Sequence, residues 1–117
     1  MSIRTTFTLA CLALSPCFAA TSKLSAVIID GVNNHDWAAG TAAIRSILEG
    51  SGRFTVDVSS FPALPDFGKY DVVINNFNGG HTPSGTRWPA EAEQALESYV
   101  RNGGGLVIYH AANNAFI

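Results

Sequence analysis

The sequence predicts an α/β domain in which helices cover a mostly parallel sheet with its strands in the order 2-1-3-4. The apparent strands and helices alternate along the chain as β-α-β-β-α-β, which is typical of parallel sheets. Three of the four strand-like segments contain a continuous apolar run, as strands buried on both faces do. The remaining segment alternates apolar and polar residues and suits the edge. A length of 117 residues allows one such domain.

The first half of the chain supplies two strands and a helix. Residues 25–30 (SAVIID) form a short apolar run that ends at the turn-prone residues 31–34. A helix is expected next, and it ends at the glycines of residues 50–52. Residues 54–58 alternate strictly, which predicts a half-buried edge strand. The apolar stripe of the helix consists of Ala43, Ile44, Ile47 and Leu48.

The second half repeats the alternation. Residues 61–69 contain two prolines and are predicted to be a loop, and residues 70–77 (YDVVINNF) a buried strand. A helix is expected from Pro89, which suits the first helical position, to residues 101–103. Residues 105–112 (GLVIYHAA) are predicted to be the last strand. Together these elements make a flavodoxin-like arrangement. The apolar stripe of this helix consists of Ala92, Ala95, Leu96, Tyr99 and Val100.

The last predicted strand is as apolar as the first, so we expect it to lie inside a sheet, with neighbours on both sides and helices over both faces. The sequence ends at Ile117, five residues beyond that strand. We therefore expect residues 20–117 to be the N-terminal, truncated portion of a longer domain. The alternative is that another chain supplies the partner strands.

The first nineteen residues have the pattern of a secretory signal peptide. Arg4 is their only charge, residues 7–14 are apolar, and Cys17 and Ala19 place small residues before a cleavage point. The apolar run is too short to span a bilayer. This leader accounts for much of the mean hydropathy of +0.18. We expect a secreted or periplasmic protein without a stable membrane span after cleavage; the alternatives are a buried N-terminal helix and a lipoprotein signal at residues 14–17 (LSPC).

Cysteine usage and charge exclude several functions. Cys11 and Cys17 are the two cysteines of the sequence, and both lie in the leader. The mature chain therefore has no disulfide, no thiolate metal ligand and no cysteine nucleophile. The net charge of −2 leaves no basic patch, so we do not expect nucleic acid as a partner.

Polar residues collect where the predicted strands end. In open parallel sheets, ligands bind beyond the carboxyl ends of the strands. All three histidines and seven of the eight asparagines fall at this rim. His35 and His110 are the catalytic candidates, as an acid/base pair; His81 is the third histidine. The substrate-binding candidates are Asn33, Asn34, Asp36, Trp37, Asn76, Asn78, Asn113 and Asn114.

These residue types suit a neutral polyhydroxylated ligand such as a sugar. Asparagine amides both donate and accept hydrogen bonds, and tryptophan offers an apolar face. Each residue also has a structural interpretation: the asparagines as turn formers, Asp36 as a helix cap, the tryptophans as packing residues and His110 as a core histidine. The two histidines would need a further ligand to hold a metal ion, so no metal site is predicted, and no cofactor is indicated.

Three blocks of sequence resemble the ThuA-like family. They are residues 33–37 (NNHDW), 70–80 (YDVVINNFNGG) and 99–116 (YVRNGGGLVIYHAANNAF), and the resemblance covers about residues 24–117. It implies a class I glutamine amidotransferase-like fold and a role in carbohydrate metabolism associated with trehalose utilisation. The candidate pocket residues that it carries over are Asn33, Asn34, His35, Asp36, His110, Asn113 and Asn114.

The related amidotransferases carry a cysteine nucleophile in the turn after the strand that ends here at residues 110–112. Ala111, Ala112 and Asn113 occupy that stretch, so glutamine hydrolysis through a thiolate is excluded. Three functions follow as alternatives: an exported enzyme acting on a sugar or glycoside, a non-catalytic carbohydrate-binding module, and an inactive fragment of a longer ThuA-like protein. The polar rim favours the first two equally, and whether the chain is an enzyme stays open.

Overall fold

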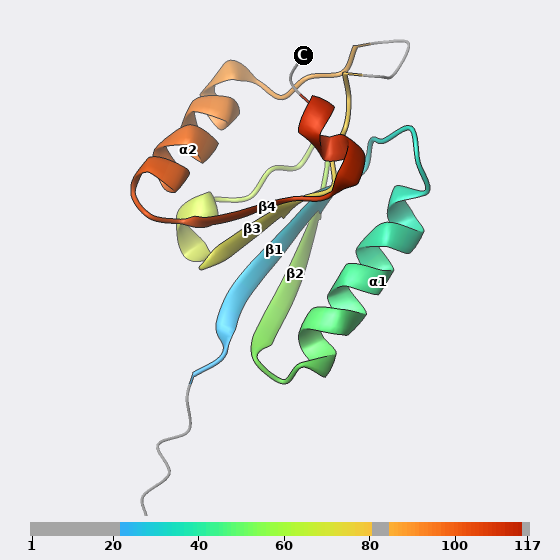
Figure 1. Ribbon diagram of the computed structural model, residues 1–117. Helices are drawn as coiled ribbons and strands as arrows, with labels where there is room; N and C mark the ends of the chain where they lie inside the picture. Colours follow the sequence, from blue (N-terminus) through green and yellow to red (C-terminus); the bar gives the residue numbers. More distant parts are fainter. Residues whose placement is uncertain (1–21, 81–84, 116–117) are drawn as a thin grey trace, which may run out of the picture.

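Four parallel strands form one sheet in the computed structural model, which describes residues 22–80 and 85–115. The strand order is β2-β1-β3-β4, as the sequence predicted, and Figure 1 shows the strands side by side. The leader, residues 1–19, and His81 lie outside the described residues. The strands are β1 (Leu24–Asp30), β2 (Phe54–Ser60), β3 (Val72–Asn75) and β4 (Gly105–Ile108).

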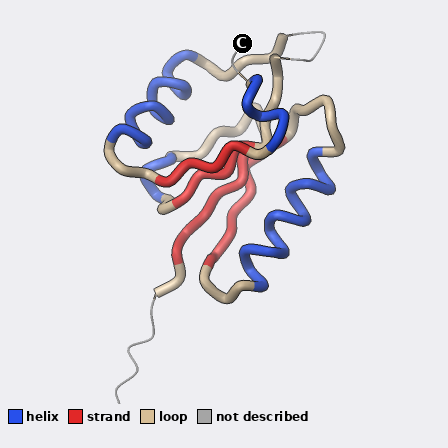
Figure 2. Tube along the Cα trace, in the orientation of Figure 1, coloured by secondary structure: helices blue, strands red, loops and turns tan. Residues whose placement is uncertain are grey.

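Two helices cover opposite faces of this sheet, α1 (Trp37–Gly50) on one face and α2 (Ala90–Arg101) on the other (Figures 1 and 2). The handedness of the connections explains this. The chain moves to one side from β1 to β2 and to the other side from β3 to β4, and right-handed crossovers then place the two helices on opposite faces. No helix in the described ranges has the length and apolarity needed to cross a membrane.

The burial of each strand follows from its neighbours. β1 pairs with β2 on one side and β3 on the other, so that Ile28 lies opposite both Val58 and Ile74. Residues 26–30 are accordingly all buried. β2 has one neighbour, and Val56 is its one buried residue. The continuous pattern therefore identified β1 correctly as an inner strand, and the alternating pattern identified β2 correctly as an edge strand.

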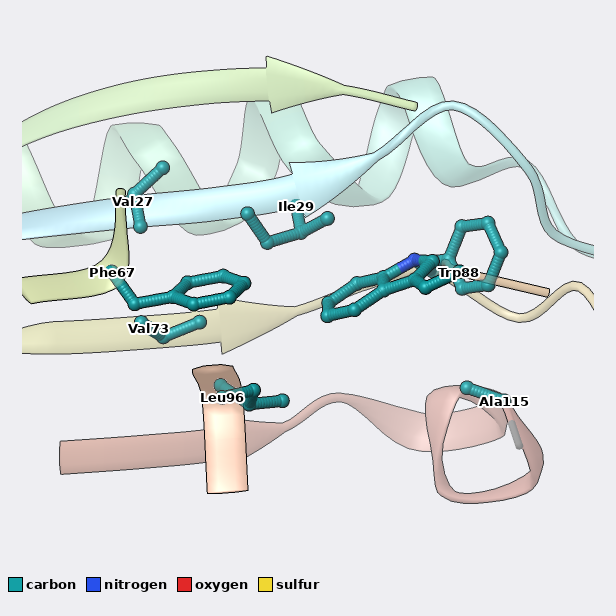
Figure 3. Close-up of a cluster of buried hydrophobic side chains, with 8 residues drawn as sticks. Val27, Ile29, Phe67, Val73, Trp88, Leu96 and Ala115 are labelled. Atoms are coloured by element: carbon teal, nitrogen blue, oxygen red, sulfur yellow. The ribbon is translucent and has the colours of Figure 1, made fainter. Parts of the chain in front are cut away.

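The larger core lies between the sheet and α2. Val27, Ile29 and Val73 from the sheet meet Leu96 of α2, as Figure 3 shows. Trp88 fills this layer, with its ring 6.0 Å from that of Phe67. Trp88 is only 3% exposed, so it is a packing residue. A smaller core between the sheet and α1 consists of Ala26, Ile28, Val56 and Ile74, with Ile44 and Leu48 packed against it.

The start of the sheet is held by a pair of hydrogen bonds between β1 and the residue before β3. The backbone N–H and hydroxyl of Ser25 donate to the same oxygen of Asp71, at 2.7 and 2.9 Å. The backbone bond, and then the hydroxyl bond, lower the pKa of Asp71 below its ordinary value. This contact fixes the register of the two inner strands at the end opposite the polar rim.

Several predicted boundaries were wrong. The last strand ends at Ile108, and a short 3-10 helix, η2 (His110–Asn114), replaces its predicted end. His110 has φ +49°, which no strand accommodates. The third strand spans four residues of the eight predicted. A second 3-10 turn, η1 (Phe67–Lys69), lies in the predicted loop, and Pro89 precedes α2 as its N-cap.

The predicted helix stripes were too wide. Ile47 is 71% exposed and Val100 40% exposed, because both lie on the flanks of their helices. Leu96 is buried, and Ile44 and Leu48 are half-buried. Fewer residues of each helix therefore pack against the sheet than the sequence predicted.

β4 lies at the edge of the sheet within the described residues, although its composition predicted an inner strand. Its one neighbour there is β3. The side chains of residues 106–109 are between 36% and 49% exposed. Val107 and Tyr109 line an apolar groove of about 290 Å³ beside α1, together with Ile44, Leu48, Phe54, Val72 and Ile74.

Two isoleucines provide a matched test of this packing. Ile28 has no exposed surface and Ile47 is 71% exposed. We expect Ile28→Ala to lower the free energy of unfolding by about 2–5 kcal/mol, because it removes a buried side chain and leaves a cavity. Ile47→Ala should change it by less than about 0.5 kcal/mol. Chemical denaturation of both variants measures the difference, and equal losses would contradict the fold.

Candidate functional site

The carboxyl ends of β1, β3 and β4 open on one edge of the sheet, because the strands are parallel. The loop after β1 begins at Gly31, where φ is +102° and a Cβ atom would lie 2.8 Å from the backbone nitrogen of Phe61. Glycine tolerates both the positive φ and this close approach. The chain therefore turns sharply from β1 into residues 33–36, which carry part of the predicted site.

Side-chain contacts with the backbone shape this loop. Asn33 Oδ1 accepts a hydrogen bond from the His35 N–H (3.1 Å), and Asn33 Nδ2 donates to the carbonyl of Asn76 (3.0 Å). Asp36 is the N-cap of α1, where its carboxylate accepts from the N–H of Ala39 (3.0 Å). Asn33 and Asp36 therefore hold the loop in place, and His35 lies between them.

His110 meets His35 from the opposite side of the rim. It lies two residues after the end of β4, and its φ of +49° turns the chain away from the strand direction. The two imidazole rings are stacked, with centroids 4.6 Å apart and planes 25° from parallel. Within the described ranges, no hydrogen bond joins a ring nitrogen of either histidine to another residue. The predicted acid/base pair is thus brought together, with its ring nitrogens open to a ligand.

Two adjacent pockets share this histidine pair. The outer pocket has a volume of about 510 Å³ and is wide open. The inner pocket has a volume of about 190 Å³ and reaches toward the start of α1. The outer pocket is lined by Asn34, His35, His110, Ala111, Asn113 and Asn114. The inner pocket is lined by Asn33, His35, Asp36, Trp37, Gly40, Asn76, Tyr109, His110 and Ala111.

All of the predicted site residues except Asn78 line one of these pockets. Asn78 is fully buried, and its Nδ2 donates to Asn34 Oδ1 at 2.9 Å. It therefore supports Asn34 from behind. The two tryptophans, which the sequence could not separate, have different places: Trp37 lines the inner pocket and Trp88 belongs to the core.

Sequence reasoning missed three residues of the inner pocket, Gly40, Tyr109 and Ala111. Tyr109 was assigned to a buried strand, but it lies 43% exposed at the pocket. A Cβ atom on Gly40 would come within 3.4 Å of both Asn76 Nδ2 and Tyr109 Cε1. A glycine inside an otherwise regular helix pattern was the available signal, since such a glycine often marks a close contact.

The chemistry of the lining suits a neutral ligand that carries hydroxyl groups. No lysine or arginine lines either pocket, and the one carboxylate, Asp36, is occupied in capping α1. Amides, aromatic faces and two imidazoles remain, which is a typical composition of a site for a small polar molecule. Across residues 22–80 and 85–115, no three His, Cys, Asp or Glu side chains gather closely enough to hold a metal ion.

Comparison with known proteins identifies relatives of this chain. A sequence family designated ThuA and described as "Trehalose utilisation" matches residues 26–116. No curated protein matches the chain in sequence.

Two solved structures are similar in fold. A ThuA-like protein from Parabacteroides merdae is 39% identical, with a TM-score of 0.72, over 81% of this chain and 35% of its own. A ThuA-like protein from Bacteroides uniformis is 23% identical, with a TM-score of 0.50, over 84% of this chain and 40% of its own. The chain therefore spans less than half the length of either protein.

The backbone of His110 gives a test of the site that needs no ligand. Side chains other than glycine are strained at φ +49°. We expect His110→Gly to be more stable than His110→Ala by about 1 kcal/mol, because only glycine relieves the strain. Both variants remove the imidazole, so their difference in unfolding free energy isolates the backbone. An equal or greater stability of His110→Ala would show that the residue has relaxed backbone angles.

Proposed function

The chain belongs to the ThuA family, and from this premise we propose that it is an exported domain that binds a neutral sugar or glycoside across the outer and inner pockets. The description of the family as trehalose utilisation supports a carbohydrate-related role in general. The observation that carries the finer proposal is the stacked pair of His35 and His110. Both pockets converge on this pair, and the amides around it match the hydroxyl groups of a sugar.

The proposed ligand lies across the boundary between the pockets. Asn34, Asn113 and Asn114 surround the outer part and offer amides to its hydroxyl groups. Trp37 and Tyr109 line the inner part and offer apolar faces to the carbon skeleton. This division follows the usual construction of small-molecule sites, in which aromatic walls provide contact area and a few polar groups fix orientation.

The histidine pair supplies the proposed chemistry. In hydrolysis of a glycoside, one imidazolium protonates the departing oxygen, and the neutral imidazole accepts the proton lost by the attacking water. Both rings lie within reach of one bound molecule because they are stacked at 4.6 Å. Most glycosidases use two carboxylates instead, and the only carboxylate in these pockets, Asp36, caps α1.

Two further parts of the proposal come from the sequence. Residues 1–19 act as an export signal, which makes the mature protein secreted or periplasmic. The protein has no glutaminase activity, because its only cysteines are Cys11 and Cys17 in the leader. The turn after β4, where the related amidotransferases carry their cysteine, begins instead with His110 at φ +49°.

A non-catalytic carbohydrate-binding module is the second candidate. One observation favours it: in the described part of the chain, neither His35 nor His110 is oriented by a carboxylate or carbonyl. Catalytic histidines are usually held by such a partner. Both candidate functions involve the same binding of a sugar. They differ in whether the bound sugar is converted to a product.

Two asparagines test the binding site. We expect Asn34→Ala to weaken trehalose binding about tenfold, the value of one hydrogen bond. Asn102→Ala is the matched control, because Asn102 is exposed at the C-terminal end of α2, and it should leave affinity unchanged. Calorimetry with trehalose, glucose and a methyl glucoside measures both. Absence of binding to all three sugars, or equal losses in both variants, would contradict the proposal.

Chromatography of the same mixtures distinguishes the enzyme from the module. An enzyme converts a bound sugar, and His35→Ala and His110→Ala lose that conversion while still binding. Binding by the unaltered protein without any product would establish the module.

A further inference from the structure

A buried carboxylate lies directly behind the inner pocket. Asp30 is the last residue of β1 and is only 2% exposed. Within the described ranges it has no lysine, arginine or histidine partner. Two hydroxyls bind it instead: Thr41 Oγ1 lies 2.7 Å from one carboxylate oxygen and Ser60 Oγ 2.5 Å from the other. Burying a charge is costly unless it is well hydrogen-bonded. A functional role for Asp30 would account for its burial.

The carboxylate determines the direction of a chain of hydrogen bonds. A carboxylate accepts hydrogen bonds and does not donate them, so the single hydroxyl hydrogen of Thr41 points at Asp30. The Thr41 oxygen must then accept from Asn76 Nδ2, which lies 3.1 Å away. Asn76 Nδ2 also donates to the carbonyl of Trp37 at 3.0 Å.

These two hydrogen bonds occupy both amide hydrogens of Asn76. What the side chain can still offer is its Oδ1, whose one contact is with Asn33 Nδ2 at 3.5 Å. Asn76 is only 2% exposed and lines the inner pocket, so Oδ1 is the acceptor that its side chain can offer there. The carbonyl of Trp37 can only accept, so it holds one of these amide hydrogens by itself, and Thr41, oriented by Asp30, holds the second.

We infer that Asp30 is a positioning residue that fixes Asn76 as a hydrogen-bond acceptor, so that the inner pocket selects a ligand hydroxyl that donates. The outer pocket has the opposite polarity. Asn34 Oδ1 accepts from Asn78 Nδ2 at 2.9 Å, which leaves the amide hydrogens of Asn34 for a ligand oxygen. The two pockets together suit a polyol with a donor at one end and an acceptor at the other.

The identity of the ligand rests on the proposed function, but the hydrogen bonds that link Asp30, Thr41 and Asn76 do not. Asp30→Asn therefore has a readout without any sugar, namely hydrogen exchange of the Asn76 side-chain amide measured by NMR. We expect this exchange to be at least tenfold faster in Asp30→Asn than in the unaltered protein, because Thr41 can then turn its own hydroxyl hydrogen toward Asn76, where it competes with the amide hydrogen. Ser60→Ala is the matched control, since it removes the other donor to Asp30 and leaves Thr41 and Asn76 in place.

Thr41 provides a second route if Asp30→Asn does not fold. Thr41→Val removes the hydroxyl and should also accelerate exchange at Asn76, whereas Thr41→Ser keeps the hydroxyl and should restore slow exchange. Exchange that stays within twofold of the unaltered protein in Asp30→Asn, or in Thr41→Val where Asp30→Asn does not fold, would overturn the inference.

Ligand selectivity tests the consequence for the pocket. Replacing a sugar hydroxyl by fluorine removes the donor and keeps the shape. Among the monofluorinated trehaloses, we expect one position to lose at least tenfold in affinity, and that loss to be smaller in Asp30→Asn. Equal selectivity in the two proteins would overturn the role of Asp30 in specificity. If the unaltered protein binds no sugar, the proposed function fails, and the exchange measurement still decides whether Asp30 orients Asn76.

Discussion

The amide nitrogen of Asn76 holds the site together. It lies 3.0 Å from the carbonyl of Trp37 and 3.1 Å from the hydroxyl of Thr41, and so ties the end of β3 to the start of α1. The carbonyl of the same residue receives Asn33 Nδ2, which fixes the loop after β1. His35 is carried by that loop, and its stacking against His110 depends on where the loop is held. One buried residue thus connects three segments that are distant in sequence.

The sequence was sufficient to predict the strand order. A strand buried on both faces is continuously apolar, whereas a strand buried on one face alternates apolar and polar residues. The apolar run of residues 25–30 and the alternation of residues 54–58 placed the inner and edge strands correctly. The end of β4 was not predictable in this way, because residues 105–112 are apolar throughout. What ends the strand is the backbone angle of His110, and hydrophobic periodicity carries no information about that angle.

The sequence predicted that the site lies at the carboxyl ends of the strands. It did not predict the role of each side chain there. Parallel strands bring their carboxyl ends together, so the topology alone gathered His35 and His110. The use of each amide depends on partners that the sequence does not link to it: Asn33 serves the loop backbone, Asn78 supports Asn34, and Asn76 is oriented through Thr41. The family match over residues 26–116 agrees with the resemblance of the three sequence blocks. It supports the carbohydrate-related role that we propose, whereas the proposed roles of individual residues rest on the contacts.

The position of the bound sugar is the central claim, and backbone amide chemical shifts during a titration with trehalose test it most directly. Our account predicts shifts concentrated in residues 33–37, at Asn76 and in residues 109–114, which line the two pockets. It predicts no shifts in the apolar groove around Ile44, Leu48 and Val107. Shifts confined to that groove, or an absence of shifts at the histidine pair under saturating sugar, would contradict it.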